Sequence, residues 1–491
     1  MTADALTVIA GFCGLAMVVA LALLPPQHCR IVAVVVSFGA VCMFGSNRTP
    51  TALWTAVALG CPVLLVVAWY RAGLVVRQVS ATMGAATTFL AIVLLSSALS
   101  GGGSPAFVPI AVMLGWTVTQ LDRRERVAVI RSIIVIGVAE FAYAAAQAVI
   151  GLQPIWGRVA SQGIDNPFAE GIDRVQASFG QAIVYGFFSA VIAFLAWSDA
   201  ARLHRGLRPV VFCVLLGGLF LSGTRSALVA LVGAIAVHAL MRPGLLRWVR
   251  NLAIALIGVA LVGLLDFGVR ALATEALDSG SWLQRLGSVN SVPRLLSRTG
   301  HDFWFGSGFG SDQELYRTGL LTSPYHFTVV DNFYVYALGT MGVVGLAALL
   351  VPLVVGFVTT GRTGRGTIVV LAVMCAAFDL LAWRSTAAVF VLLLVIDPAH
   401  GVMLRLRTDD ATGEVAQRPG TPASRHARPR TRRSAPLDDL ARTEPLARTS
   451  PTWSVPSPRT AKPAMPFRPA VATVSDDVQS RPEKRRHGYP T

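Results

Sequence analysis

Residues 209–241 read PVVFCVLLGGLFLSGTRSALVALVGAIAVHALM, two long apolar runs separated by the short polar sequence SGTRS. Both runs are continuously apolar and lack the alternation of a half-buried strand, so they predict two membrane helices joined by a tight hairpin. The hairpin carries Arg225, whose charge must be satisfied by a partner. This arginine is either an interfacial anchor or part of a binding site, and the rest of the sequence bears on that choice.

The composition places the whole chain in the membrane class. Of its 491 residues, 54% are hydrophobic and 14% charged, and the mean hydropathy is +0.60, values outside those of soluble globular proteins. Continuous apolarity favours helices over a barrel and predicts an all-α polytopic membrane protein with 12–13 transmembrane helices. The first run has no basic region before it and leads into another span, so we do not expect a cleaved signal peptide. The predicted spans are 5–24, 31–45, 51–70, 81–99, 105–120, 127–150, 179–198, 209–222, 225–241, 250–268, 333–358, 366–383 and 386–398.

Arginine-rich loops alternate with loops that are nearly uncharged or mixed in charge. Because positive loops stay in the cytoplasm, this alternation predicts an extracytoplasmic N-terminus and two long extracytoplasmic loops, 151–178 and 269–332. Arg225 then lies at the outer face, where the same rule disfavours arginine, and this weakens its interpretation as an anchor. The predicted cytoplasmic loops carry Arg71 and Arg77; Arg123, Arg124 and Arg126; Arg202, Arg205 and Arg208; Arg242, Arg247 and Arg250; and Arg362 and Arg365.

The composition changes after about residue 399. Residues 1–400 form the predicted transmembrane domain, whereas 401–491 are rich in Pro, Arg, Ser, Thr and Ala and predict a disordered cytoplasmic tail. The tail holds 17 basic and nine acidic residues, a net charge of +8 out of the chain's +16. We expect it to lie near anionic lipid headgroups. Because its aromatic residues are isolated and its basic residues dispersed, nucleic-acid binding is not expected.

Cysteine and glycine patterns exclude several chemistries. The six cysteines lie in or beside apolar runs without a CxxC or Cys/His cluster, so neither a disulfide framework nor a zinc site is predicted. The sequence has no Walker A or HExxH pattern, and we expect neither metal nor cofactor. The glycines of GSGFGS at 306–311 follow no parallel strand and predict a tight turn rather than a phosphate loop.

Several arginines gather on the predicted outer face. Arg174 precedes a span, Arg225 stands in the hairpin, and Arg294 lies in the long loop. The planar guanidinium stays charged and binds two oxygens of a diphosphate or carboxylate, so these three are candidate ligands for an anionic lipid diphosphate. Interfacial anchoring or a structural salt bridge is the alternative for each. Arg285 and Arg298 are interpreted as ordinary loop charges.

Five short motifs follow one another between roughly residues 170 and 350: SFG before a span, SGTRSA in the hairpin, RLLSR in the long loop, GHDFWFGSGFG, and DNFYVYALGTMGVVGL at the next span. Their order and spacing resemble the O-antigen ligase and Wzy-type polysaccharide polymerase superfamily. The resemblance implies an all-helical membrane glycosyltransferase of GT-C-like architecture that uses neither metal nor nucleotide sugar. Such enzymes move a glycan from a polyprenyl-diphosphate carrier to an acceptor on the extracytoplasmic face.

By this resemblance, Arg225 contacts the carrier diphosphate, Arg294 matches a loop arginine of similar role, and Arg174 matches the arginine before the corresponding span. The implied partners are a polyprenyl-diphosphate-linked glycan donor, a glycan acceptor, membrane lipids and other polysaccharide-assembly proteins. The implied location is the bacterial plasma membrane, with the active site on the extracytoplasmic face.

One position departs from the family pattern. Ligases usually carry His-Asn where this chain has Asp331 and Asn332, and that histidine is the proposed base. Here the resemblance assigns the base to Asp331, or to His326 five residues earlier, and a substrate contact to Asn332. A carboxylate can accept a hydroxyl proton if a poorly hydrated site raises its pKa. The alternatives are that Asp331 caps the next helix and that His326 is an exposed loop residue; His301 is interpreted as structural.

Charges within the spans have structural alternatives. Glu140 interrupts 127–150 and, as an intramembrane carboxylate, is a functional hypothesis, although it could instead pair with Gln147. Arg131 is expected to snorkel to the cytoplasmic surface. Two more pairs at the predicted outer ends of spans are interpreted as helix-end salt bridges: Asp266 with Arg270, and Asp379 with Arg384. The pair Asp379 and Arg384 could also line the outer cleft.

Several functions remain open. Polymerisation of repeat units in exopolysaccharide, capsule or O-antigen-like biosynthesis is favoured, because Asp-Asn resembles polymerase-like members and the Arg-rich, Lys-poor composition is typical of GC-rich bacteria. An O-antigen-type ligase is the alternative within the superfamily. A lipid-linked sugar transporter or flippase would line ionisable residues along several spans, where the sequence offers Glu140 and little else. A non-catalytic scaffold with a recruiting tail is the last alternative.

Overall fold

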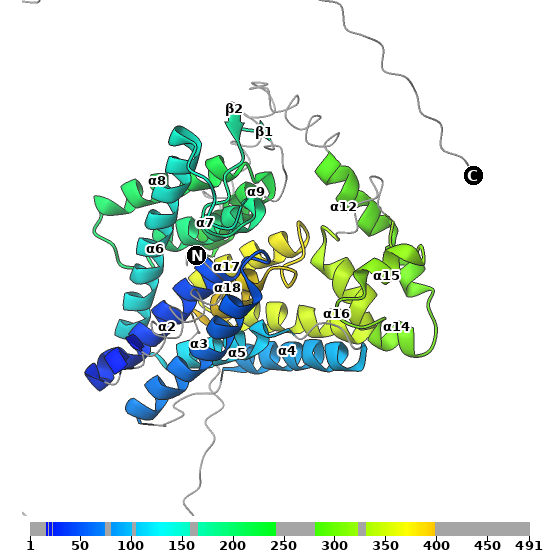
Figure 1. Ribbon diagram of the computed structural model, residues 1–491, viewed down its shortest axis with the longest axis horizontal. Helices are drawn as coiled ribbons and strands as arrows, with labels where there is room; N and C mark the ends of the chain where they lie inside the picture. Colours follow the sequence, from blue (N-terminus) through cyan, green and yellow to red (C-terminus); the bar gives the residue numbers. More distant parts are fainter. Residues whose placement is uncertain are drawn as a thin grey trace, which may run out of the picture. The chain divides into compact units, whose positions relative to one another are not determined.

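The computed structural model describes residues 16–17, 19–21, 23–73, 80–100, 105–157, 165–241, 280–322 and 330–397 (Figure 1). Contacts divide the chain into the units Met1–Asp409 and Asp410–Thr491, and all described residues belong to the first. The predicted tail, the predicted span 250–268 and most of the first predicted span lie outside the described residues.

The described residues are mostly helical, which confirms an all-α polytopic membrane protein. Among them, five helices are long and apolar enough to cross a membrane: α2 (Pro26–Phe44), α3 (Thr51–Arg71), α4 (Ala81–Ser100), α6 (Arg123–Ile150) and α16 (Phe333–Thr359). Shorter apolar helices accompany them: α5 (Phe107–Gln120), α7 (Ala182–Trp197), α8 (Leu207–Ser222), α9 (Arg225–Leu240) and α18 (Arg384–Val395). The remaining elements are α17 (Arg362–Cys375), the antiparallel pair β1 (Asp165–Asn166) and β2 (Ala169–Asp173), and the helices α12 (Gly280–Asn290), α13 (Val292–Leu296), α14 (His301–Phe305) and α15 (Asp312–Arg317).

One predicted span is shorter than expected. The run 366–383 is helical only to Cys375, where α17 ends, and residues 376–383 form turns. Asp379 holds the chain in this turn, because its Oδ1 accepts the N–H groups of Leu381 (2.9 Å) and Ala382 (3.2 Å). An aspartate that binds backbone donors two and three residues ahead favours a turn over a continued helix. The prediction of a continuous helix to residue 383 is therefore wrong.

Two helices are enclosed on all sides. Every residue of α7 from Val184 to Ala196 is buried, and the helix packs against α8, α9 and α17. Every residue of α18 from Ser385 to Val395 is also buried, against α5, α2 and α4. A helix that is apolar all round is stable where neighbours or lipid cover it, so α7 and α18 form the core. By contrast, α3 exposes side chains such as Leu59 at 67%.

Contacts join segments that loop charge assigns to the same face. Among the predicted cytoplasmic segments, Arg131 Nε of α6 donates to the carbonyl of Ala201 at 2.8 Å. Among the predicted outer segments, Asn47 Nδ2 donates to the carbonyl of Ala382 at 2.7 Å. The grouping by charge agrees with these contacts. Which group faces the cytoplasm stays a prediction.

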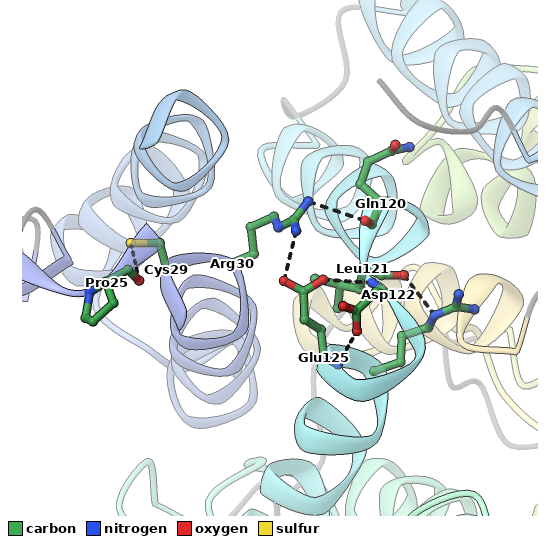
Figure 2. Close-up of polar contacts among 8 residues, drawn as sticks. Pro25, Cys29, Arg30, Gln120, Leu121, Asp122 and Glu125 are labelled. Carbon is green, nitrogen blue, oxygen red and sulfur yellow. Dashed lines mark hydrogen bonds and ion pairs between the residues drawn. The ribbon is translucent and has the colours of Figure 1, made fainter. Parts of the chain in front are cut away.

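A buried ion pair joins the second turn of α2 to the first turn of α6 (Figure 2). Arg30 Nη2 lies 2.9 Å from Glu125 Oε1, and Arg30 Nη1 donates to the carbonyl of Gln120 at 3.4 Å. Glu125 also completes a capping box, because its Oε2 accepts the N–H of Asp122 (2.7 Å) and its own N–H donates to Asp122 Oδ1 (2.8 Å). One carboxylate therefore fixes both the start of α6 and the position of α2.

Glu125→Ala is expected to destabilise the protein by about 3–5 kcal/mol, because it leaves a buried arginine without its counter-ion. The side chains of Arg30 and Glu125 are only 11% and 9% exposed. Thermal unfolding of the purified protein in detergent measures the effect. The control is Glu314→Ala, which breaks an exposed pair with Arg317 (2.6 Å) and should shift the midpoint little. Equal shifts in the two variants would contradict the prediction.

Candidate functional site

The hairpin between α8 and α9 depends on Gly223 and Thr224. Gly223 ends α8 in the left-handed conformation (φ +63°), and a β-carbon there would lie 2.9 Å from Arg174 Cγ. Glycine therefore makes the turn and also admits the arginine. Thr224 is the N-cap residue of α9, which begins at Arg225. Arg225 is thus half-buried at the positive end of a helix dipole, a place that suits an anion.

The segment before α7 carries Arg174 onto this hairpin. Arg174 Nε donates to the carbonyl of Ser222 at 3.0 Å, and its Nη2 donates to Thr224 Oγ1 at 3.3 Å. The N–H of the next residue, Val175, donates to the carbonyl of Leu221 at 3.0 Å. Backbone and side chain together fix Arg174 beside the turn that starts α9.

Arg285 of α12 and Arg225 both lie within electrostatic range of Arg174. Burial lowers the pKa of Arg174, and the positive charges of Arg285 and Arg225 lower it further. Burial likewise lowers the pKa of Arg285, whereas the carboxylate of Asp331 raises it. Arg285 Nε is held by the carbonyl of Ala377 at 3.1 Å. We name Arg174, Arg225 and Arg285 the arginine cluster.

The interpretation of Arg285 as an ordinary loop charge does not match its position. In α12, Trp282 and Leu286 are both 42% exposed, whereas Gln284 and Ser288 are buried. The helix therefore turns its polar side, including Arg285, towards the protein. The signal was present in the sequence GSWLQRLGSVN, because a helical projection separates its apolar side chains from Gln284, Arg285 and Ser288.

Arg294 makes different contacts from those expected. It is exposed on α13, and its Nη1 donates to the carbonyl of Gly319 at 2.8 Å. Its guanidinium therefore holds the turn after α15. Among the described residues, it is Arg285 rather than Arg294 whose charge acts on Arg174.

The candidate base and its neighbour precede α16. Asn332 is the N-cap residue, since its Oδ1 accepts the N–H groups of Tyr334 (3.1 Å) and Val335 (3.2 Å). The capping role considered for Asp331 therefore belongs to Asn332. Burial raises the pKa of Asp331, and Arg285 lowers it. This half-buried carboxyl group and the arginine cluster are thus electrostatically coupled.

Asp379 lies near two other carboxyl groups, those of Asp331 and Asp312. Asp379 is buried in the connection between α17 and α18, and burial raises its pKa to about 7. The nearby charges of Asp312 and Asp331 add to this rise. The sequence predicts a pair between Asp379 and Arg384. In the structure, the Arg384 guanidinium lies over the Trp54 ring, 5.0 Å from its centre. Because the charge of Asp331 acts on Asp379, Asp379 lies near the candidate site.

The two candidate histidines have different outcomes. His326, the alternative base, lies outside the described residues. His301 is on α14 with its side chain 69% exposed, and its ring centre is 5.2 Å from that of Phe305. The structural interpretation of His301 stays a prediction.

Arg298 has a structural role at a break in α16. The helix is interrupted at Gly342 (φ +65°), which leaves the carbonyls of Leu338 and Gly339 without their helical donors. Arg298 donates to both, at 2.7 Å and 3.0 Å, and the N–H of Ser307 donates to Gly339 at 3.2 Å. The long loop thus replaces the hydrogen bonds that the break removes.

The glycines of 306–311 form the tight turn that the sequence predicts. Gly306, Gly308 and Gly310 have φ values of +72°, +100° and +88°. The N–H of Gly308 donates to the carbonyl of Thr340 at 2.7 Å, and a β-carbon on Gly308 would overlap Ser100. The turn is therefore wedged between α16 and the end of α4, a place where only glycine fits.

The fold and this site define a polytopic α-helical membrane protein with an arginine cluster beside carboxyl groups. The model of the family described as O-antigen ligase matches residues 210–350, which include Arg225, Arg285 and Asp331. The match confirms the similarity to the O-antigen ligase and Wzy-type polymerase superfamily and supports glycan handling of the ligase or polymerase type. No curated protein matches the chain.

Proposed function

We propose that the chain transfers a glycan from a polyprenyl-diphosphate carrier to an acceptor glycan on the extracytoplasmic side of a bacterial plasma membrane. The observation that carries the proposal is the arginine cluster. Arg285 and Arg225 both bring positive charge to Arg174, and Arg225 stands at a helix N-terminus, so an anion with several oxygens is stabilised when it binds beside Arg174. A diphosphate meets this description, and the polyprenyl chain attached to it suits a site on a membrane protein.

The chemistry follows from the charges of the site. The acceptor hydroxyl oxygen attacks the anomeric carbon of the donor glycan. The bond from that carbon to the diphosphate oxygen breaks, and its electron pair stays on the diphosphate. The arginine cluster stabilises the charge that develops on this leaving group. The hydroxyl proton passes to the carboxylate of Asp331, whose raised pKa makes it a better base than an ordinary aspartate.

Polymerisation of repeat units is the form of this reaction that we favour. The Asp331-Asn332 pair stands where ligases of the family carry His-Asn, and it resembles polymerase-like members. The test is the size distribution of surface and carrier-linked glycan in the native host with and without the gene. Single repeat units accumulating on the carrier support a polymerase, and long chains stranded on the carrier support a ligase. An unchanged profile contradicts both.

The rate of transfer is expected to fall as pH is lowered through the pKa of Asp331, because the protonated carboxyl group cannot act as base. Burial places this pKa above the ordinary aspartate value, and Arg285 limits the rise. Arg285→Gln removes that opposing charge, so the acidic limb of kcat/KM should move to higher pH even though the maximal rate also falls. The control is Arg317→Gln, an exposed arginine of the same loop. A limb that stays in place in Arg285→Gln would remove Asp331 as the titrating base.

A further inference from the structure

Two polar side chains of α6 point to one short segment that lies next to Arg174. Glu140 and Gln147 are seven residues apart, which places them on the same face of a helix long enough to span the membrane. An ionisable residue within such a helix needs a partner. The expected pairing between Glu140 and Gln147 is not the arrangement found, because each binds the segment that precedes α7.

The contacts are directional and reach both backbone and side chain. Glu140 Oε1 accepts the hydroxyl of Ser178 at 2.6 Å, and its Oε2 accepts the N–H of the same residue at 3.1 Å. Gln147 Oε1 accepts the N–H of Ala177 at 3.1 Å, and Gln147 Nε2 donates to the carbonyl of Ala177 at 3.2 Å. Four hydrogen bonds from one helix therefore hold two consecutive residues.

The segment needs this support because its backbone is unfavourable. Ala177 has φ +48°, in the left-handed region that residues other than glycine seldom adopt. Such a conformation persists where surrounding contacts determine it. Ala177 and Ser178 are both buried, so water does not replace the contacts.

The held segment leads directly to Arg174. Gln176 Nε2 donates to the carbonyl of Gly157, and the N–H of Val175 donates to Leu221 on α8. The chain from residue 174 to 178 is thus fixed at one end by the hairpin and at the other by α6. Arg174 begins this fixed stretch, and its guanidinium donates to Ser222 and Thr224 of the hairpin.

We propose that Glu140 and Gln147 are positioning residues that hold residues 175–178 and so place Arg174 in the arginine cluster. The role given to Arg174 rests on the proposed function. Glu140 acts here through hydrogen bonds to Ser178 and touches no reacting atom. An intramembrane carboxylate is in this way coupled to the binding of the donor diphosphate.

The test uses the full chain in lipid nanodiscs and two measurements. Hydrogen exchange of the peptide that contains Ala177 and Ser178 reports on the segment, and binding of a polyprenyl diphosphate reports on the arginine cluster. In Glu140→Ala, exchange should rise and affinity should fall about tenfold or more, as for the loss of hydrogen bonds to a charged group. Glu140→Gln keeps an acceptor for the Ser178 N–H and gains a donor for its hydroxyl oxygen, so it should remain close to wild type.

Two further variants complete the design. Tyr143→Phe alters the same helix, but Tyr143 binds Gln153 and Ile155 instead, so exchange at 177–178 and lipid affinity should not change. Ser178→Ala removes the 2.6 Å bond from the loop side and serves if Glu140→Ala does not fold. Ser178→Ala should raise exchange and weaken lipid binding, and both effects should be smaller than in Glu140→Ala.

Three outcomes overturn the proposal. Exchange at wild-type rates in Glu140→Ala means that Glu140 does not hold the segment. Faster exchange with unchanged affinity, while Arg174→Ala weakens binding, means that the segment does not position Arg174. Glu140→Gln as impaired as Glu140→Ala means that the charge, not hydrogen bonding, is needed. A wild-type protein that does not bind the lipid instead contradicts the proposed function, and the exchange result still decides whether α6 holds the segment.

Discussion

Alanine in place of Arg225 is expected to slow glycan transfer by roughly 100-fold or more, the usual effect of losing one charged donor that stabilises a developing oxyanion. Arg225 begins α9 in a half-buried position, and its positive charge acts on Arg174. A diphosphate bound there meets two guanidinium groups and the positive end of a helix dipole. The measurement is the size distribution of carrier-linked and surface glycan at matched expression.

Lysine at the same position separates charge from geometry. Arg225→Lys keeps the positive charge but loses the planar fork that binds two oxygens, so its activity should lie between those of wild type and Arg225→Ala. The control is Arg208→Ala, at the other end of α8 in a partly exposed pair with Asp199 at 3.7 Å, which should leave the glycan profile unchanged. A normal profile in Arg225→Ala would remove this residue from the site.

Gly308→Ala is expected to prevent most of the protein from folding, with a loss of roughly 3–5 kcal/mol from backbone strain and overpacking together. Gly308 has φ +100°, and its β-carbon would overlap Ser100 at the end of α4. Because the same turn supplies hydrogen bonds to the broken part of α16, its displacement also uncovers backbone carbonyls. Monodisperse yield after detergent extraction and the midpoint of thermal unfolding measure the effect.

Gly310→Ala is the matched control. Gly310 lies two residues away with φ +88°, but a β-carbon there meets no atom within 4 Å. It therefore isolates the strain of a positive φ from the overlap, and the protein should fold with a smaller loss of stability. If both alanine variants behaved alike, the close approach of the turn to α4 would not be what requires glycine.

The sequence was sufficient for the helices and insufficient for their breaks. Apolar runs gave nearly the observed bounds of α3 and α4, because length and continuous apolarity decide whether a segment can span. The same criterion missed the end of α17 at Cys375, since residues 376–383 are apolar enough to continue. The turn there depends on one buried carboxyl group, that of Asp379.

For the candidate site, the sequence predicted the residue types and their common face but not the contacts. The hairpin SGTRS is a local structure, so Arg225 could be singled out from its neighbours alone. Choosing between Arg285 and Arg294 required knowing that Arg285 reaches the carbonyl of Ala377, in the connection between α17 and α18. Arg298 had no local signal, because the carbonyls that it binds belong to α16 and are free only where Gly342 interrupts the helix.

By itself, the sequence determined a polytopic helical membrane protein with arginines gathered at one end of its spans, because hydropathy and loop charge act over a few residues at a time. Only the tertiary structure decided which arginines lie together and what holds them. Arg285 binds a carbonyl 92 residues away, and Glu140 binds a serine 38 residues away. Such contacts depend on how helices pack, and side-chain packing between distant segments leaves no periodic signal in the chain.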